Sequence, residues 1–324
     1  MSIDLGNNPS GNRPTIAQKT QMRASIGCSQ APFLIGMTEQ LVDNSNSFLK
    51  NPESKFVFQI GAVNSLNFQY AGGIPTIVNL NALHDKNTIT SINGIEASLL
   101  GLDASNCTGI NAACEFNQCS HLANPNFSGC SNLPYIGFYD NPLTSLNVAE
   151  CTKLTTLNCI YNNQLTDINL NGCTKLINFD CYNNQLTNLN VAGLTGLTTL
   201  GCSYNQITGL NVSGCTKLTS LSCIYNSLTN LNVAGLTGLT TLNCSQNSLT
   251  GLNLSGCTNL TSLNCQYNNL TSASVNNILI TLSGLGKSSG SATINAGGIG
   301  PPTGLGISAK TYLINTKAWS VSTN

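Results

Sequence analysis

The side chains of this sequence that could do chemistry are mainly its fifteen cysteines and two histidines, because thiolates and imidazoles act as nucleophiles and as metal ligands. One group of them is compact in the sequence: Cys107, Cys114, Cys119, His121 and Cys130. Zinc sites usually separate their close ligand pairs by two to four residues, whereas these cysteines are separated by six, four and ten. We therefore favour buried thiols over a zinc site, and we predict no metal ligands.

Catalysis needs a positioned acid, base or nucleophile, and the sequence offers few. His84 and His121 are its only histidines, and it contains neither a nucleophile elbow nor a phosphate-binding loop. Asp167 and Asp180 fall in one repeat but in opposite halves of it, so they form no carboxylate pair. We predict a protein that is not an enzyme, with no catalytic residue and no cofactor.

The low content of charged residues argues against two further classes of function. The chain has 324 residues, with 12 basic and 12 acidic side chains, and only 7% of it is charged, against about 25% in an ordinary globular chain. Lys217 is the only charged residue between Leu186 and Val275. Such a surface has no basic stripe for phosphates or anionic lipids, so we expect no binding to nucleic acid. No uncharged apolar run of about 18 residues exists, and we expect no membrane insertion.

The cellular setting follows from the N-terminal residues and the cysteines. The segment "MSIDLGNNPSGNRPTIAQK" has no apolar stretch of the kind an export signal carries, so we expect synthesis in the cytoplasm without Sec export. Most cysteines recur at repeat positions, and their total is odd, which favours reduced thiols over a disulfide framework.

These side chains must be positioned by a repeat of about 21 residues. Equivalent apolar residues are separated once by 22 residues and then five times by 21: Leu143, Leu165, Leu186, Ile207, Leu228, Leu249 and Leu270. The second half of each copy reads L-x-x-L-x-C-x-x-N-x-L, as in "LTTLGCSYNQI". Within it, Leu200 and Cys202 alternate with Thr199 and Gly201, the period of a strand with one buried face.

The pattern resembles the leucine-rich repeat proteins of the short bacterial type, over residues 122 to 275 and more loosely back to about 60. The resemblance implies a repeat solenoid with a parallel β-sheet. The first half of each repeat is a weaker copy of the second, so we expect a mostly extended convex side rather than helices. The segment from Ile110 to Leu122 has two residues too many for the pattern.

Two columns of the repeat are predicted to be structural. The first is a core column of small soft side chains: Cys159, Cys181, Cys202, Cys223, Cys244 and Cys265, with Phe138 one coil earlier. The second follows three residues later and should bond the backbone of successive coils: Asn141, Asn162, Asn184, Asn205, Asn226, Asn247 and Asn268.

Four segments are predicted along the chain. They are an attachment or linker segment with a short helix (1–50), irregular N-terminal coils and a cap (51–121), regular repeats (122–272) and a small α+β C-terminal cap (273–324). The cap should contain a helix from about Ser274, a strand at "SATINAGG", a second helix and a final strand. Both ends of the chain, "NRPTIAQKTQMRASIG" and this cap, resemble parts of bacteriophage tail-fibre proteins.

The candidate binding residues lie on and beside the outward face of the predicted sheet. They are Tyr161, Tyr182, Tyr204, Tyr225 and Tyr267, together with Asn158, Asn243 and Asn264. Aromatic rings stack on sugars and amides bond to hydroxyl groups, and both side chains also serve protein contacts. The alternative is that the tyrosines only cover the asparagine column by packing on the next coil.

We therefore expect a non-enzymatic binding protein, a bacteriophage tail-fibre or receptor-binding component that recognises a bacterial surface receptor, with polysaccharide as one candidate. Residues 1–50 would contact other tail or baseplate proteins, a homo-trimer is one candidate assembly, and the location would be the virion. The alternatives are a structural virion or filament component and a bacterial surface adhesin, the latter located at the cell surface.

Overall fold

The computed structural model describes residues 55–56, 65–69, 76–80, 86–95, 97, 99–295 and 297–324. The predicted attachment segment, residues 1–50, lies outside them, and so does His84. The chain divides into two compact units, unit 1 (Met1–Cys173) and unit 2 (Thr174–Asn324). This division falls inside the stretch predicted as regular repeats, and the four predicted segment boundaries stay predictions.

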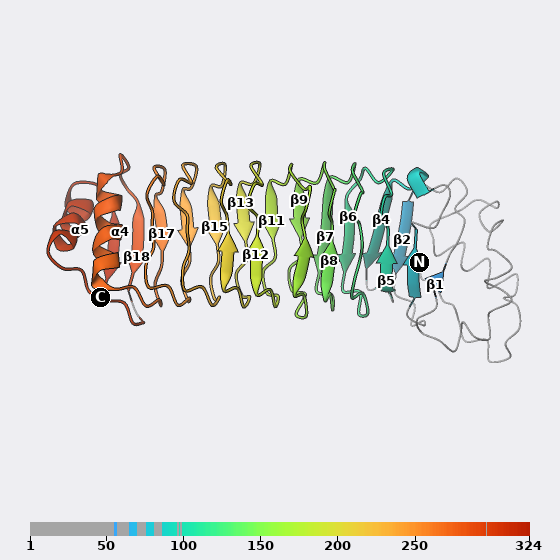
Figure 1. Ribbon diagram of the computed structural model, residues 1–324, viewed down its shortest axis with the longest axis horizontal. Coiled ribbons are helices and arrows are strands. Elements are labelled where there is room, and N and C mark those ends of the chain that lie inside the picture. The colour runs from blue at the N-terminus through green and yellow to red at the C-terminus, as the bar shows by residue number, and fades with distance from the viewer. Residues whose placement is uncertain are drawn as a thin grey trace, which may run out of the picture. The chain divides into compact units, whose positions relative to one another are not determined.

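Each coil of unit 1 contributes one strand to a parallel sheet, here called the main sheet (Figure 1). Its strands neighbour one another in the order β2 (Ser65–Gln69), β4 (Ser91–Ile95), β6 (Cys114–Asn117), β7 (Tyr135–Tyr139) and β9 (Thr156–Asn158). A short 3-10 helix, η2 (Lys86–Thr88), precedes β4. The opposite side of the coils carries β1 (Lys55–Phe56), β3 (Thr76–Asn79) and β5 (Leu99–Asp103), and the pair β8 (Ser145–Asn147) and β10 (Asp167–Asn169).

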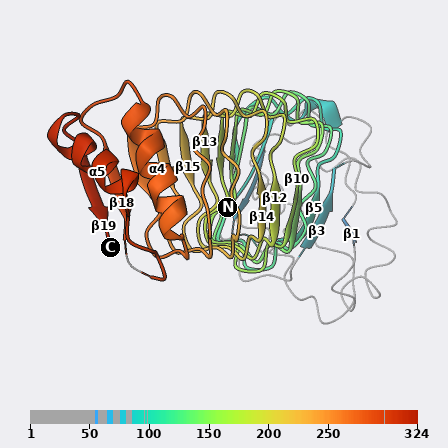
Figure 2. The same ribbon diagram turned by 60° about the vertical axis from the view of Figure 1, so that its left-hand side comes forward.

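Unit 2 has the same plan. Its main sheet runs β11 (Asn178–Asp180), β13 (Thr199–Gly201), β15 (Ser220–Ser222), β16 (Thr241–Asn243), β17 (Ser262–Asn264), β18 (Ser291–Ile294) and β19 (Ser320–Thr323). On the opposite side β12 (Asn188–Asn190) pairs with β14 (Gly209–Asn211), and Asn232 bridges to Asn253. The extended convex side predicted from the sequence is therefore confirmed (Figure 2).

The register of the sheet equals the sequence repeat. Leu200 pairs with Leu221, Leu221 with Leu242 and Leu242 with Leu263, always 21 residues apart. These side chains and the cysteines two residues later are buried, with at most 1% of their surface exposed. Identical side chains thus stack on one another in successive coils and form continuous core columns. Each coil contacts only its immediate neighbours in the repeat order. The predicted inward and outward alternation is confirmed.

The core of unit 1 contains aromatic rings where unit 2 has thiols. Phe116 and Phe138 stack at 5.3 Å between ring centroids, and Phe127 meets both rings at 5.7 and 6.1 Å. Phe116 and Phe138 occupy the column that holds cysteine in later coils, which shows that apolar burial rather than sulfur chemistry is what the position requires.

Unit 2 ends in the predicted cap. Helix α4 (Ser272–Gly284) begins at Thr271, whose side chain accepts a hydrogen bond from the Ser274 backbone, and it buries Val275, Ile278, Leu279 and Leu282. Helix α5 (Leu305–Asn315) packs against α4, and Trp319 is buried beneath the cap, where Nε1 donates to the Lys287 carbonyl at 3.2 Å. The helix, strand, helix, strand order is confirmed. Within the described residues, no helix is long and apolar enough to cross a membrane.

Candidate binding face

After each main-sheet strand the chain makes a turn, here called the sheet-side turn, that is held from inside by the predicted asparagine column. The Asn205 side chain donates to the carbonyls of Cys181 at 2.9 Å and Cys202 at 3.2 Å, and it accepts from the Leu186 backbone N–H at 3.0 Å. Asn226, Asn247 and Asn268 repeat this arrangement in unit 2. The structural role predicted for the column is confirmed.

In unit 1 the same column contains one substitution that the sequence pattern did not identify. Asn141 donates to the Phe116 carbonyl at 2.8 Å and accepts from the Cys119 backbone at 2.8 Å. Cys119 thus stands where the other coils have asparagine, and its Sγ lies 3.4 Å from the Gly94 carbonyl. The two extra residues of this coil are placed one before β6 and one after Cys119.

The residue just before each asparagine has a left-handed backbone. Its φ lies between 51° and 59° in the coils of the candidate tyrosines: Tyr161, Tyr204, Tyr225 and Tyr267. Residues other than glycine reach this region at a cost, and tyrosine is not among the types enriched there, which are asparagine, aspartate and histidine. Coils with Gln246, Asn183 or Asp140 at the same place show that tyrosine is not required by the turn itself.

The tyrosines contact one another along each unit but remain exposed. In unit 2 the ring of Tyr204 lies 5.0 Å from Tyr182 and stacks at 4.6 Å on Tyr225. In unit 1 Tyr139 meets Tyr161 edge to face at 5.5 Å. Between 37% and 47% of the surface of Tyr139, Tyr161, Tyr204, Tyr225 and Tyr267 is exposed. Both sequence interpretations therefore describe part of the geometry, because the rings pack on neighbours and still present a face to solvent.

The three candidate asparagines lie on the outward face of the main sheet, and each one accepts a local hydrogen bond. Asn158 accepts from the Ile160 N–H at 3.3 Å, Asn243 from Ser245 at 3.2 Å and Asn264 from Gln266 at 3.2 Å. These bonds fix the side-chain oxygen in an Asx turn and orient the amide nitrogen. A ligand on this face would therefore meet asparagine donors rather than acceptors.

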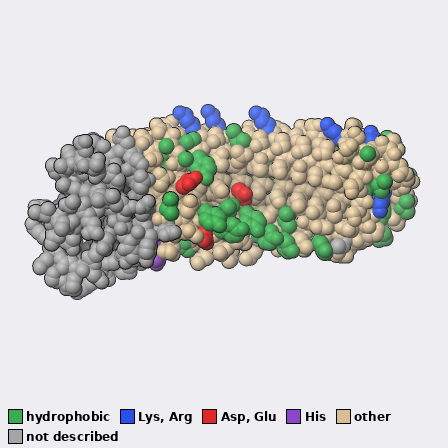
Figure 3. All heavy atoms as spheres, turned by 180° about the vertical axis from the view of Figure 1, so that it is seen from behind, with side chains coloured by type: hydrophobic (Ala, Val, Ile, Leu, Met, Phe, Trp, Pro, Cys, Tyr) green, Lys and Arg blue, Asp and Glu red, His purple; other side chains and the backbone are tan. Residues whose placement is uncertain are grey.

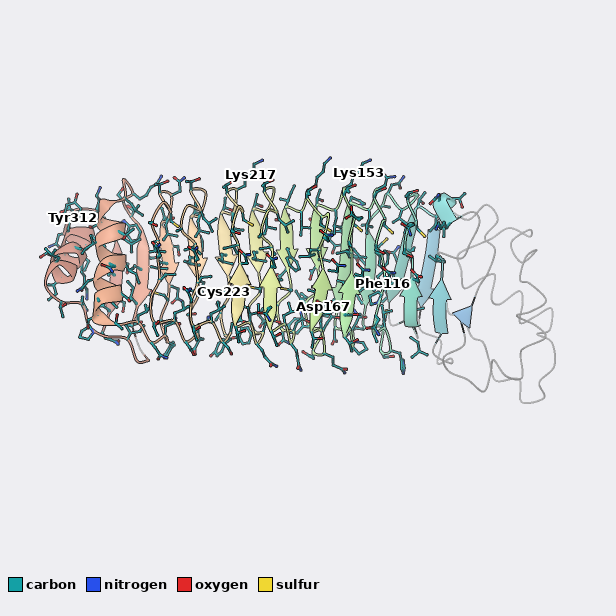
Figure 4. All side chains as sticks on the ribbon, in the orientation of Figure 1. Phe116, Lys153, Asp167, Lys217, Cys223 and Tyr312 are labelled. Carbon is teal, nitrogen blue, oxygen red and sulfur yellow. The ribbon has the colours of Figure 1, made fainter. Side chains whose placement is uncertain are left out.

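The charged side chains are segregated on the face that Figure 3 shows. Carboxylates lie beside hydrophobic side chains, with tyrosine included among them, whereas lysines lie along the edge and at the cap. Lys153 and Lys217 project from the turns that precede the main strands (Figure 4). In unit 1 Glu115 lies on the outward face of β6 and Asp140 follows β7, and burial and the Glu115 carboxylate raise the pKa of the Tyr135 hydroxyl. In unit 2 burial raises the pKa of Asp180.

The cysteines give no reactive site in the described part of the chain. All fourteen cysteines described there are buried with free thiols, and burial raises the pKa of Cys202 to about 12 and of Cys119 to about 11. The thiolate is the form that reacts as a nucleophile and binds metals, and the raised pKa disfavours it in these buried thiols. The same residues contain no group of three or more His, Cys, Asp or Glu side chains that could hold a metal ion.

Sequence reasoning missed two features of this face. The left-handed tyrosines cannot be recognised from hydrophobic periodicity. The period and spacing of residues indicate on which face a side chain lies, but they do not indicate its backbone φ. Glu115 and Ile95, the latter with 50% of its surface exposed, lie in coils whose alignment was irregular, whereas Asp140 lies in a coil that fits the repeat. The pairing of Glu115 with Gly137, and of Gly137 with Asn158, was the available signal that Glu115 faces outward on the main sheet.

Short parallel strands in exact repeat register, a buried asparagine column and an extended opposite side define a leucine-rich repeat solenoid. The functional domain of InlJ from Listeria monocytogenes, which includes a cysteine ladder, is similar to it at 27% identity with a TM-score of 0.48, over 64% of this chain and 49% of that one. The chain thus spans about half the length of that domain.

Two further solved structures are similar at lower identity. The internalin InlF from Listeria monocytogenes matches at 17% identity with a TM-score of 0.46, over 91% of this chain and 98% of that one. YopM from Yersinia enterocolitica matches at 16% identity with a TM-score of 0.44, over 88% and 70%. No protein-family model matches the chain, and no curated protein sequence does. The predicted resemblance of the two ends to bacteriophage proteins receives no support from these comparisons.

Proposed function

We propose that the chain is a non-enzymatic recognition protein whose main-sheet face and sheet-side tyrosines bind a macromolecule, a protein or a polysaccharide. The observation that carries this proposal is the left-handed backbone of four half-exposed tyrosines. The turn requires the left-handed conformation in each of these coils but does not require tyrosine there, and a bulky residue kept in a strained conformation suggests a functional role. Aromatic rings at these positions supply contact area at low entropic cost, and the neighbouring amides supply hydrogen-bond donors.

The setting of this binding is a further part of the proposal. A bacteriophage receptor-binding component would act on a bacterial surface receptor and would be located in the virion. Its support is the sequence pattern of the two ends, and residues 1–50 would then contact other tail or baseplate proteins. A bacterial surface adhesin would instead be located at the cell surface and would bind a partner outside the cell. Both settings require the same binding face.

The experiment measures binding of the full chain to bacterial cells, to their extracted surface polysaccharides and to cultured animal cells. The test variant is Tyr204→Ala with Tyr225→Ala, which removes the stacked pair of unit 2. The matched control is Tyr312→Ala on α5, a tyrosine of similar exposure (43%) that lies away from the main sheet. We expect saturable binding to one class of surface, weakened about tenfold or more in the test variant and unchanged in the control.

The class of surface distinguishes the settings, since bacterial strains would indicate a receptor-binding component and animal cells an adhesin. Equal binding by the parent and the test variant, with both equally folded by thermal denaturation, would exclude the tyrosines as the binding site. Equal loss in both variants would show that exposed tyrosine in general, rather than this face, causes adhesion.

A further inference from the structure

Unit 1 presents an exposed patch with two carboxylates, whereas the main-sheet face of unit 2 has one, Asp180. We define the unit 1 patch as Ile95, Glu115, Tyr139, Asp140 and Tyr161. Ile95 pairs with Asn117 and Asn117 with Tyr139, so Ile95 and Tyr139 lie in one row across β4, β6 and β7. Tyr161 continues this row through its contact with Tyr139. Three large side chains, with 50%, 43% and 37% of their surface exposed, therefore form an apolar stripe.

A carboxylate lies on each side of this stripe. Glu115 is on the outward face of β6, opposite Gly137, and Asp140 follows Tyr139 in the sheet-side turn. Two residues of β7 lie between Gly137 and Asp140, so the two carboxylates are roughly 10 Å apart. Both are exposed, and the Gln118 amide donates to Asp140 at a long 3.4 Å.

Among the residues that the structure describes, no cation lies beside these carboxylates on the patch. Strands β6, β7 and β9 and the three residues after each of them contain no lysine or arginine. Lys86 and Lys153, the lysines of unit 1 whose side chains are described, lie ahead of β4 and β9, on the turns at the other end of the main strands. Lys153 there donates to the Asn132 amide oxygen at 2.7 Å. A ligand on the patch thus meets aromatic faces and negative charge together.

We propose that the unit 1 patch binds a cationic polypeptide segment, with arginine or lysine side chains spaced to reach Glu115 and Asp140 and with apolar or guanidinium contacts on Tyr139 and Tyr161. Cations are attracted both to carboxylates and to the faces of tyrosine rings. Two anionic groups about 10 Å apart favour a polypeptide over a single small amine, because an extended chain spaces its residues i and i+3 by about that length. This inference rests on the proposed function and names one ligand class for it.

The test uses fluorescence anisotropy of the full chain with a labelled dodecapeptide of repeating Arg-Gly-Ser, and with its Glu-Gly-Ser counterpart, at 50 mM NaCl. The patch variant is Glu115→Gln with Asp140→Asn, and asparagine is readily accepted at the left-handed position 140. The matched control is Glu150→Gln with Asp167→Asn. It removes the same charge from the opposite turn and from β10, on the other side of the coils.

We expect the parent to bind the arginine peptide and not the glutamate peptide. The patch variant should bind it about fivefold more weakly or worse, because two exposed ion pairs are lost, whereas the control should stay within about twofold. The parent's affinity should fall with added salt. A Tyr161→Ala variant should also lose affinity, which a purely electrostatic attraction to the whole unit would not predict.

Absence of binding by the parent, or equal loss in the patch and control variants, would overturn the inference. Neither result affects the proposed function, since that proposal is tested on Tyr204 and Tyr225 of unit 2. The Tyr204→Ala and Tyr225→Ala variant should keep its affinity for the arginine peptide. If cell binding depends on those tyrosines while the peptide does not bind, the function stands and the ligand class assigned to unit 1 is wrong.

Discussion

Each coil of this solenoid turns twice, and the two turns reach the same backbone conformation with different side chains. The opposite turn follows the strands on the far side of each coil, and its left-handed residue is Gly129, Gly172, Gly193, Gly214, Gly235 or Gly256 in most coils. In the coils of the asparagine column, the sheet-side turn has tyrosine at its left-handed position four times and never glycine. Glycine is the residue with no steric cost at such a position, so the opposite turn follows the requirements of folding alone. The sheet-side turn departs from them.

The two turns also satisfy their backbone differently. In the opposite turn an exposed asparagine caps a neighbouring N–H, as Asn190 does for Ala192 at 3.1 Å, and a thiol lies close to a carbonyl of the preceding coil, as Cys215 does to Val191 at 3.2 Å. In the sheet-side turn a buried amide makes bonds to two coils at once. The buried amide thus stabilises the sheet-side turn from inside. This stabilisation offsets the cost of a strained residue on the outer side of the turn.

The largest effect we expect comes from the thiols that lie behind both turns. Burial raises the pKa of Cys202 and Cys244 to about 12, against about 8.5 in an unfolded chain. The folded state therefore favours the protonated thiol. Its stabilisation is complete below about pH 8.5 and is lost as the pH rises toward 12, because the unfolded chain then releases protons that the folded chain retains. We expect the free energy of unfolding to fall steeply above pH 9.

Urea unfolding between pH 7 and 10.5, in the presence of a non-thiol reductant, measures this dependence. The matched variant is Cys215→Leu with Cys257→Leu, because Leu194 and Leu236 already occupy the same column. Removing two thiols whose pKa burial raises should make the slope less steep in the alkaline range, by at most about 1.4 kcal/mol per pH unit for each thiol. An unchanged slope would mean that these opposite-turn thiols do not titrate differently on unfolding, and the comparison of the two turns would lose its energetic basis.

The next largest effect distinguishes Asn205, in the sheet-side turn, from Asn190, in the opposite turn. Asn205→Ala leaves the buried Leu186 N–H without its acceptor, and an unsatisfied buried group costs about 1–3 kcal/mol. The Cys181 and Cys202 carbonyls each lose one donor but keep another, from Asn184 and Asn226. We expect a loss of about 2 kcal/mol or more in the free energy of unfolding. Asn190→Ala removes one bond at an exposed turn, and the loss should stay below about 1 kcal/mol. Equal losses, measured by denaturant unfolding, would contradict the distinction between the turns.

The sequence predicted the features that follow from side-chain burial and missed a feature that depends on backbone conformation. The leucine, cysteine and asparagine columns follow from spacing, since burial on a short strand has period two and the coils repeat every 21 residues. The cap was predicted because the apolar residues of α4, Val275, Ile278, Leu279 and Leu282, have helical spacing. The strained backbone of Tyr204 was not predicted. A tyrosine in a turn does not indicate a positive φ, whereas a glycine does.

The unit 1 patch was missed for a different reason. It depends on Glu115, whose coil has an extra residue at each end of β6 and therefore falls out of the repeat alignment. Only the pairing of β6 with β7 places Glu115 opposite Gly137, on the same face as the tyrosines. Register between irregular coils is set by packing of Phe116 on Phe138, a contact that no spacing rule encodes.

The smallest effect tests the left-handed positions directly. Gly214→Ala places a Cβ at φ +79°, where space is available but the conformation is unfavourable, so we expect a loss of about 1–2 kcal/mol.

Tyr204→Asn makes the opposite change, because asparagine tolerates this region better than tyrosine. Its gain is offset by the lost stacking on Tyr182 and Tyr225, and the free energy of unfolding should change by less than about 0.5 kcal/mol. Denaturant unfolding measures both variants, and surface binding measures the second. A Tyr204→Asn variant that unfolds like the parent but binds more weakly would show that the tyrosine is held there for its ligand. A loss of 2 kcal/mol or more would instead assign the ring to packing, and the difference between the two turns would then be one of stability alone.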